Sequence, residues 1–305
     1  MTSSSSPSSA SAPAGAPVPA LSAAGAHPFR LTGRNRVLFF LTAWLIVLMP
    51  FLFWWNTWFG RQLSDKQLGE YIADEKHPRH IQHALVQLST LMQRGDPKAA
   101  RWYPQVVALA PSPVEEIRNT DAWVMGQDTS GAGFHEALLK MLGDSSALVR
   151  GNAALSLVRF GDATGRPQLL DLLQPVSILA PASGTVADES TVGTAVHHGG
   201  LIAKIKLDQE HSRTQYIEVR SSISGRVRSL AAPIGTHVAV ASELASIDPS
   251  DDQVWEALRA LFVVGRLEDL PQVRLYERDT PRISDRIRQQ AALTERAIRE
   301  RGVQP

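Results

Sequence analysis

The sequence of 305 residues contains no cysteine. This absence excludes disulfide bonds, thiolate metal sites, iron–sulfur clusters, thiol catalysis and haem attached through a CxxCH motif. Neither sign of charge predominates either, because 31 Lys and Arg residues stand against 30 Asp and Glu residues. A nearly neutral chain lacks the basic field that draws proteins to nucleic acid, so we expect no nucleic-acid partner.

Motifs that bind phosphate or activate a nucleophile are missing as well. The chain has no P-loop, no glycine-rich dinucleotide fingerprint and no nucleophile elbow. The acidic cluster of Asp248, Asp251 and Asp252 is expected to cap a helix that begins before Val254. No residues can be named for catalysis, and we therefore expect a protein that is not an enzyme.

The N-terminal part of the sequence changes from a polar tail to a long apolar run. Residues 1–33 are rich in Ser, Ala and Pro and show no hydrophobic periodicity, so we expect a disordered tail. Within 36–60, the stretch 37–59 contains no charged residue. At a rise of about 1.5 Å per residue this stretch spans a hydrocarbon core of roughly 30 Å. The pattern predicts a transmembrane helix whose partner is the lipid bilayer.

Two alternatives compete with a membrane anchor. A buried helix of a soluble core is seldom apolar on every face over such a length. A signal peptide has a shorter apolar region followed by small residues at a cleavage site, whereas this run ends with Trp54, Trp55 and Trp58. Tryptophan is enriched where membrane helices meet the interface. We therefore expect an uncleaved single-pass anchor with these tryptophans at the membrane interface.

Basic residues beside the apolar run indicate its orientation. Arg30, Arg34 and Arg36 precede the run, and Arg61 and Lys66 follow it. Because Lys and Arg are enriched on the cytoplasmic side of membrane helices, we expect the N-terminus in the cytoplasm. In a bacterium this orientation predicts an inner-membrane protein with the bulk of its chain in the periplasm.

Residues 64–175 are expected to be helical and to contain a repeat. Apolar residues recur every three or four positions in IQHALVQLSTLM, 81–92. Further on, EIRNTDAWVMG aligns with LVRGNAALSLVRFG at a spacing of 32 residues, which places Arg118 opposite Arg150. In the same alignment Ala122 stands opposite Ala154. A period of this length is typical of helical repeats.

The stretch LLKMLGDSSALVRGNAALSLVRFGD resembles the two-helix unit of HEAT-type repeats. In this resemblance Asp144 ends the first helix, Val149 and Arg150 open the second, and small residues near Ala153 pack against the neighbouring repeat. The resemblance implies a solenoid, because each helix pair buries its apolar face only against the next pair. It also implies a surface for macromolecules, so we expect other membrane or periplasmic proteins as partners.

Residues 176–249 contain the same pattern twice. Gly184 and Gly193 in the first copy are followed by Gly225 and Gly235 in the second, at distances of 41 and 42 residues. Apolar residues around them alternate as in half-buried strands, and the glycines are expected at structural turns. A duplication that keeps its register so well indicates two equivalent β-rich halves.

The duplicated pattern resembles the biotinyl/lipoyl domain, which is a flattened β-barrel of two interlocked four-strand halves. The first half carries the family's opening proline as Pro181 and a third glycine as Gly199 or Gly200. The second half has Ser222 and Ala241 near the corresponding positions. The resemblance implies a barrel over 176–249.

Carrier domains of this family hold their cofactor on a lysine at the tip of the hairpin that joins the halves. In this chain that lysine is expected near Gln209 to Thr214, and the tip DQEHSRTQ contains no lysine. Lys204 and Lys206 lie on the strand that leads into the tip. We therefore expect no cofactor, and a biotin or lipoyl carrier is the third hypothesis for function.

The same fold without the lysine occurs in periplasmic adaptor subunits, or membrane-fusion proteins, of efflux and secretion systems. Such adaptors also have a short cytoplasmic tail and one membrane helix. This chain departs from them in two respects, because no coiled-coil hairpin separates its halves and helices follow its barrel.

Residues 250–303 return to helical patterns that look HEAT-like. Apolar residues from Val254 to Phe262 share one helical face. A second helix is expected over 280–301, with Thr280 as its N-cap and a proline at its start. The barrel is thus expected to be inserted within the helical array or near its end.

Three histidines, His77, His80 and His83, follow one another at intervals of three residues. On a helix this spacing can present imidazoles to one metal ion. We expect a solvated helix start and no metal site, because Pro78 interrupts the stripe and no carboxylate completes it. The three histidines are the candidates should a site exist.

Together these features predict an α+β multidomain protein with one N-terminal transmembrane helix, a HEAT-like solenoid and a lysine-less lipoyl-like barrel inserted before the last helices. The leading hypothesis is a non-enzymatic, membrane-anchored scaffold or adaptor that organises partner proteins. The alternative is an atypical membrane-fusion or adaptor subunit of an efflux or secretion system. Copies of the same chain, as a homo-oligomer, are also candidate partners.

Overall fold

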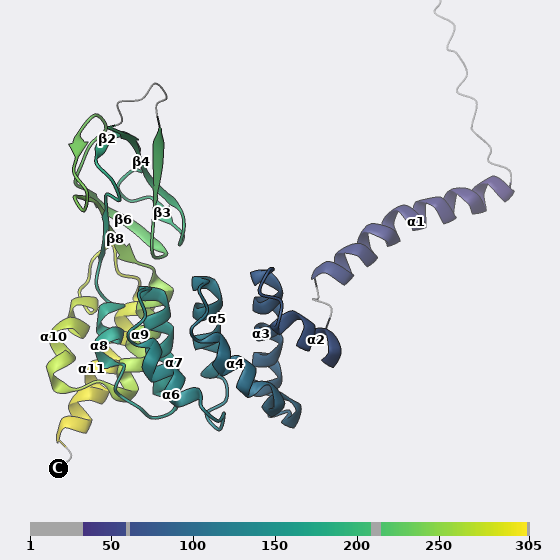
Figure 1. Ribbon diagram of the computed structural model, residues 1–305, viewed down its shortest axis with the longest axis horizontal. Helices are drawn as coiled ribbons and strands as arrows, with labels where there is room; N and C mark the ends of the chain where they lie inside the picture. Colours follow the sequence, from purple (N-terminus) through teal and green to yellow (C-terminus); the bar gives the residue numbers. More distant parts are fainter. Residues whose placement is uncertain (1–32, 59–61, 209–214, 304–305) are drawn as a thin grey trace, which may run out of the picture. The chain divides into compact units, whose positions relative to one another are not determined.

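The computed structural model describes residues 33–58, 62–208 and 215–303. It shows a mixed α+β protein with many helices and two antiparallel sheets (Figure 1). The chain divides into two compact units, Met1–Arg61 and Gln62–Pro305. The tail expected before residue 33 lies outside the described residues.

The first unit contains helix α1 (Gly33–Trp58). Its described side chains are those of Val37 and 39–52, and nearly all of them are apolar and exposed. Within the residues described here and in the second unit, no helix combines the length and apolarity needed to cross a bilayer. The side chains of Trp54, Trp55 and Trp58, expected at the membrane interface, lie outside those described.

The second unit combines a helical array with two sheets. Its helices are α2 (Asp65–Ile72), α3 (Pro78–Gln93), α4 (Tyr103–Leu109), α5 (Glu115–Met125), α6 (Phe134–Met141), α7 (Ala147–Arg159), α8 (Arg166–Asp171), α9 (Asp251–Val264), α10 (Leu270–Val273) and α11 (Asp285–Val303). Three short 3₁₀ segments are η1 (Pro97–Trp102), η2 (Leu267–Asp269) and η3 (Arg274–Tyr276).

Every second helix of the array belongs to one continuous layer. Helix α3 contacts α5, α5 contacts α7, α7 contacts α9, and α9 contacts α11. Helices α2, α4, α6 and α8 each contact the helix that follows them in this layer (Figure 1). Each pair thereby buries its apolar face against the next pair, which is how repeat arrays obtain a continuous core.

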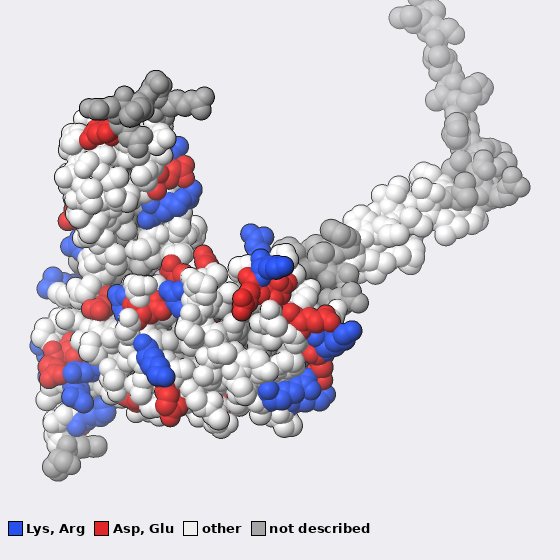
Figure 2. Space-filling view, in the orientation of Figure 1, with Lys and Arg blue, Asp and Glu red and all other residues white. Residues whose placement is uncertain are grey.

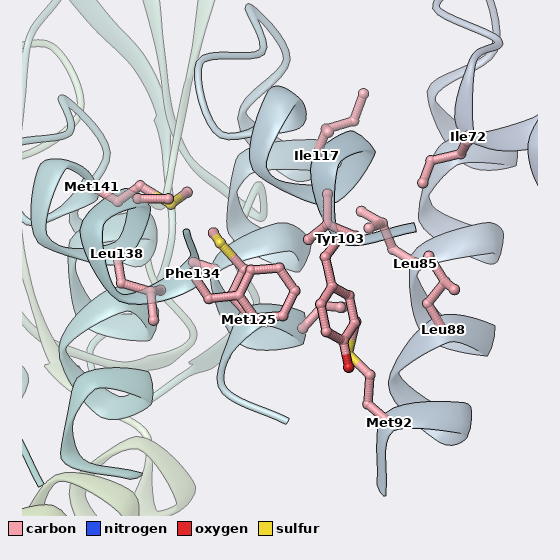
Figure 3. Close-up of a cluster of buried hydrophobic side chains, with 14 of the residues drawn as sticks. Ile72, Leu85, Leu88, Met92, Tyr103, Ile117, Met125, Phe134, Leu138 and Met141 are labelled. Atoms are coloured by element: carbon pink, nitrogen blue, oxygen red, sulfur yellow. The ribbon is translucent and has the colours of Figure 1, made fainter. Parts of the chain in front are cut away.

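The core of the array lies between these helix pairs (Figure 3). Phe134 and Leu138 of α6 face Met125 of α5, while Leu85 and Leu88 of α3 lie on the other side of α5. All five side chains are buried completely. Burying a side chain of this size contributes about 1.5–3 kcal/mol.

The expected helical stripe of 81–92 is buried at Ile81, Ala84, Leu85, Leu88 and Met92, and Leu91 is only partly buried. The stripe expected in α9 is buried at Val254, Leu258 and Leu261, whereas Phe262 is 43% exposed. Phe262 lies directly after Leu261 in the last turn of α9, one helical step of about 100° away from the buried stripe.

Equivalent contacts recur at the spacing of 32 residues that the sequence suggested. The guanidinium of Arg118 donates to the carbonyl oxygen of Ser112 at 2.9 Å, six residues earlier in the chain. The guanidinium of Arg150 donates to the carbonyl oxygen of Asp144 at 2.8 Å, again six residues earlier. The two arginines therefore fasten the same turn in successive helix pairs.

The helix boundaries correct three expectations. Helix α6 ends at Met141 and Asp144 lies in the turn after it, while α7 begins at Ala147 with Ser146 as its N-cap. The N-cap of α9 is Ser250, whose hydroxyl accepts from the backbone amide of Gln253, so the expected acidic N-cap is wrong, although α9 begins before Val254 and has Asp251 and Asp252 in its first turn as expected.

The last helix also starts later than expected. Helix α11 begins at Asp285, and the expected cap and proline start at 280–281 are wrong. Instead, the amide of Ile283 donates to the carbonyl oxygen of Thr280 at 3.0 Å. Pro281 thus occupies the second position of a four-residue turn, where its fixed backbone angle is favoured.

Eight strands form two four-stranded sheets between α8 and α9. They are β1 (Val176–Leu179), β2 (Gly184–Glu189), β3 (Ala195–Val196), β4 (Leu201–Leu207), β5 (Tyr216–Arg220), β6 (Gly225–Leu230), β7 (His237–Val238) and β8 (Glu243–Pro249). The strand orders are β1-β8-β6-β3 and β5-β4-β2-β7. The two sheets together are called the barrel below.

Each of the two sheets contains strands from both halves of the duplicated sequence. Replacing each strand of the first sheet by its counterpart four strands away along the chain gives the second sheet. The register of β2 against β4 shifts after Val186, and that of β6 against β8 shifts after Val227, 41 residues later. Val186 and Val227 are both 1% exposed in the shared core.

The paired glycines lie where a side chain does not fit. A Cβ atom on Gly184 would lie 2.2 Å from the carbonyl oxygen of Lys206, and one on Gly225 would lie 1.9 Å from that of Asp248. Gly193 and Gly235 have φ angles of 89° and 88°, which glycine adopts without steric cost. All four glycines therefore lie at the close contacts and turns that the duplicated pattern predicts.

At one turn of the barrel an alanine, Ala241, stands where a glycine is expected. Its φ angle is 64°, and it is the only residue other than glycine with positive φ among those described. Its counterpart 42 residues earlier is Gly199, whose φ angle is 76°. The second half thus keeps the left-handed turn of the first with an alanine, at a cost of about 1–2 kcal/mol.

Candidate functional site

The joining of the barrel to the helical array is the first candidate site. Strand β1 follows α8 and strand β8 precedes α9, and β1 pairs with β8 from Val176 opposite Ile247 onward. The entry and exit of the barrel therefore lie side by side, and α8 and α9 remain in contact. The barrel is an insertion into one helix pair of the array.

Backbone oxygens at the end of α8 fasten this joint. The side-chain amide of Gln253 in α9 donates to the carbonyl oxygen of Leu172 at 2.9 Å. The hydroxyl of Tyr276 donates to the carbonyl oxygen of Leu173 at 2.5 Å. Burial raises the pKa of Tyr276 to about 12, so the hydroxyl keeps its proton and remains a donor.

A salt bridge also joins α8 to the segment η2 that follows α9. Arg166 of α8 contacts the carboxylates of Glu268 and Asp269, and its Nη1 lies 2.9 Å from Oδ1 of Asp269. The side chain of Asp269 is 1% exposed and that of Arg166 is 16% exposed. Residues separated by 103 positions, one before the barrel in the chain and one after it, are thereby held together.

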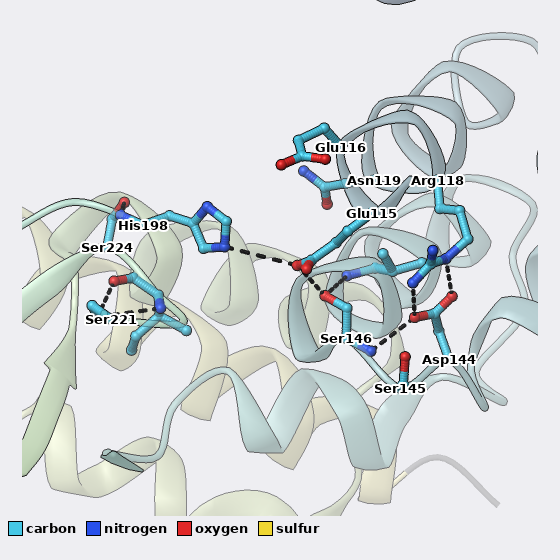
Figure 4. A network of polar contacts seen from close by, with 12 residues as sticks. Glu115, Glu116, Arg118, Asn119, Asp144, Ser145, Ser146, His198, Ser221 and Ser224 are labelled. Atoms are coloured by element: carbon cyan, nitrogen blue, oxygen red, sulfur yellow. Dashed lines mark hydrogen bonds and ion pairs between the residues drawn. The ribbon is translucent and has the colours of Figure 1, made fainter. Parts of the chain in front are cut away.

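A polar network connects the barrel to the starts of α5 and α7 (Figure 4). Nε2 of His198, in the turn between β3 and β4, lies 3.8 Å from Oε1 of Glu115 at the start of α5. The same carboxylate accepts from the hydroxyl of Ser146 at 2.7 Å. Leu148 of α7 adds an apolar contact, because its side chain packs against the core of the barrel.

Asp144 anchors the array side of this network. Its two carboxylate oxygens accept from Arg118 at 2.7 and 3.0 Å, which is a bidentate pair. The amide of Ser146 donates to the same carboxylate at 2.8 Å. The hydrogen bonds from Arg118 hold the pKa of Asp144 below its usual range, so the aspartate stays charged at neutral pH.

A groove on the array is the second candidate site. It has a volume of about 790 Å³ and lies between α4 and α6, with Val107, Ala137 and Met141 among its apolar lining. Glu136 and Lys140 stand at its edge, and both are exposed. Figure 2 shows charged side chains of both signs interspersed over the visible face of the array.

The tip of the hairpin between β4 and β5 is the place where the sequence lacks the lysine of carrier domains. The positions from Gln209 to Thr214 lie outside the described residues. Lys204 lies on β4 and its Nζ is 3.9 Å from Oε1 of Glu218 on β5, so this lysine contacts the neighbouring strand. Lys206 also lies on β4, opposite Tyr216.

The histidine cluster is the third candidate site, and the structure adds a carboxylate to it. Nδ1 of His77 lies 2.8 Å from Oδ2 of Asp74, and Nδ1 of His80 lies 2.7 Å from the same oxygen. His83 is not part of this cluster, and its ring centroid lies 6.1 Å from that of Tyr71. Hydrogen bonds from His80 and His77 lower the pKa of Asp74, so the carboxylate is charged at neutral pH.

Sequence reasoning missed Asp74 although a signal was present. Asp74 precedes His77 by three residues, so DEKHPRH continues the same interval. The proline between the histidines argued against one helix face, but Pro78 is the first residue of α3 and His77 is its N-cap. Proline is well tolerated at that position, and a turn before the helix can therefore supply ligands that a helical stripe cannot.

Comparison of the chain with protein-family models and with curated proteins finds no match.

Proposed function

We propose that the protein is a membrane-anchored scaffold or adaptor that holds partner proteins with a HEAT-like array and a lysine-less, lipoyl-like barrel. Helix α1 is the anchor, with the N-terminus in the cytoplasm and the second unit in the periplasm of a bacterium. The apolar, exposed side chains of α1 support this part of the proposal, because a hydrocarbon environment favours them and water does not.

The insertion of the barrel into one helix pair carries the proposal. Domains that follow one another along a chain usually meet at small, mobile interfaces. Here two chain connections and the apolar contact of Leu148 join the barrel to the array, and the Arg166–Asp269 salt bridge holds together the helical segments before and after the barrel. A unit built in this way presents two binding surfaces in a fixed relation, as a scaffold requires.

The exchange of strands between the halves supports the lipoyl-like part of the proposal. Interlocked halves related by a twofold exchange are what the resemblance implies, and the strand orders follow that exchange. The tip sequence has no lysine to carry biotin or lipoate. The barrel therefore contributes shape and surface to the scaffold.

The groove between α4 and α6 is the surface on which a partner can be sought. We expect a photo-crosslinking residue introduced at Lys140, at the edge of the groove, to trap a partner protein in native membranes. The matched control is the same residue at Arg296, which is 79% exposed on α11. Capture from position 140 and not from 296 supports the proposal.

Two other results decide against it. If both positions yield only the uncrosslinked monomer, the groove binds no protein and the scaffold proposal fails. If intact-mass measurement of the chain from its own cells shows a biotin or lipoyl adduct, the protein is a carrier instead. Identification of the captured partner as a transporter would make the adaptor subunit the better description.

A further inference from the structure

The cluster of Asp74, His77 and His80 is placed by backbone as well as side-chain contacts. The amide of His77 donates to the carbonyl oxygen of Asp74 at 3.0 Å, and the amide of His80 donates to that of His77 at 2.8 Å. The chain therefore turns twice between the end of α2 and the first turn of α3. These turns bring one oxygen and two ring nitrogens within 4.8 Å of one another.

The neighbouring Tyr71 orients one of the ligands. Its ring stacks on that of His80, with centroids 4.3 Å apart and planes inclined by 14°. A stacked imidazole loses much of its rotational freedom before any ion binds, which lowers the cost of ordering it in a site. The side chains of His77 and Asp74 are 63% and 27% exposed, so an ion can reach the cluster from solvent.

The ligand set favours a borderline transition metal over a hard cation. Two imidazole nitrogens and one carboxylate oxygen are ligands of Zn²⁺, whereas Mg²⁺ and Ca²⁺ prefer oxygen alone. Ligand atoms of a tetrahedral zinc site lie about 3.3 Å apart when the bonds are about 2.0–2.1 Å. The two distances from Asp74 to the rings, 2.8 and 2.7 Å, need to open by only about half an ångström.

We propose that Asp74, His77 and His80 form a Zn²⁺-binding site at the start of α3. The three side chains supply three ligands, and the exposure of His77 leaves the fourth position to water or another donor from solution. The inference does not rest on the scaffold proposal, because the ion would bind to the isolated chain.

Equilibrium dialysis of the full chain in detergent, purified without a histidine tag, tests the site with Zn²⁺ as the probe. We expect the unchanged protein to retain one zinc ion per chain. The double variant His77→Ala, His80→Ala is expected to retain none, and Asp74→Asn to bind more than about tenfold more weakly. The control is His83→Ala, which removes a histidine of the same helix outside the cluster and should bind like the unchanged protein.

Co²⁺ provides a second measurement, because its visible absorption reports the ligands directly. A band that appears with the unchanged protein and with His83→Ala, and disappears in the double variant, assigns the ion to this cluster. Circular dichroism of the double variant should match that of the unchanged protein, since both histidines are partly exposed. Failure of the unchanged protein to bind Zn²⁺, or binding of equal affinity by the double variant, overturns the proposal.

Discussion

Asp121 places a carboxyl group in the core of the array, and its replacement tests how far burial of this group lowers the stability of the protein. It lies on α5, is 0% exposed, and neither of its oxygens has a hydrogen-bond partner. Burial raises its pKa well above 3.8, so the folded protein holds a proton on this group that the unfolded chain releases. We expect Asp121→Asn, which has nearly the same shape and no charge, to stabilise the protein at neutral pH.

The change in the free energy of unfolding follows from the proton that the folded protein keeps on Asp121. Above pH 3.8 the unfolded chain binds fewer protons than the folded protein at this group, so stability decreases as pH rises. The decrease is about 1.4 kcal/mol per pH unit for as long as the folded carboxyl stays protonated. The substitution should therefore raise the free energy of unfolding by an amount that grows with pH above 3.8 and vanishes below the ordinary pKa.

Thermal and denaturant unfolding between pH 3 and pH 7 measures this difference. In a unit of this size about 1 kcal/mol shifts Tm by roughly 2–4 °C. The control is Glu116→Gln, the same chemical change at an exposed position of α5, which should alter stability by less than about 0.5 kcal/mol. A variant no more stable than the unchanged protein at any pH would refute the assignment of Asp121 as a buried carboxyl that stays protonated in the folded protein.

Three further experiments test the left-handed turn, the joint and the anchor. Ala241→Gly should raise the free energy of unfolding by about 0.5–1 kcal/mol in urea titrations, because relief of strain exceeds the added chain entropy; destabilisation would contradict this. Arg166→Ala should lower it by about 3–5 kcal/mol, because Asp269 is left buried and unpaired, and Asp269→Asn in the same chain should recover part of the loss. Since the chain has no cysteine, single cysteines can report orientation: in intact cells a membrane-impermeant maleimide should label Glu300→Cys and not Ser5→Cys, and the reverse result would refute the proposed topology.

Much of the architecture follows from local patterns in the sequence. Glycines kept at intervals of 41 and 42 residues predicted two equivalent halves, because the close contact at Gly184 and the left-handed turn at Gly193 each exclude other residues. The alignment of Arg118 with Arg150 predicted equivalent turns, because both arginines bind a carbonyl oxygen of the turn before their helix. Such signals are local, and a single sequence contains them.

The sites depend on contacts that no local pattern specifies. Thr280 and Pro281 have the composition of a helix start, but the same residues also suit a turn, and packing of the C-terminal helices decides between the two. The contact of His198 with Glu115 joins residues 83 positions apart (198 minus 115), across an insertion whose orientation the sequence does not give. Asp74 was missed because its ligand geometry depends on a turn and not on a helical face.

The exchange of strands has a consequence for how such a barrel could arise. Each sheet takes strands from both halves, so a chain carrying one half would lack partners for its shortest strand and could not close a core. Two separate copies of that shorter chain could supply each other's missing strands as a symmetric dimer. Fusion of those copies would give the present order, and a barrel cut at the tip between β4 and β5 should reassemble from its two pieces.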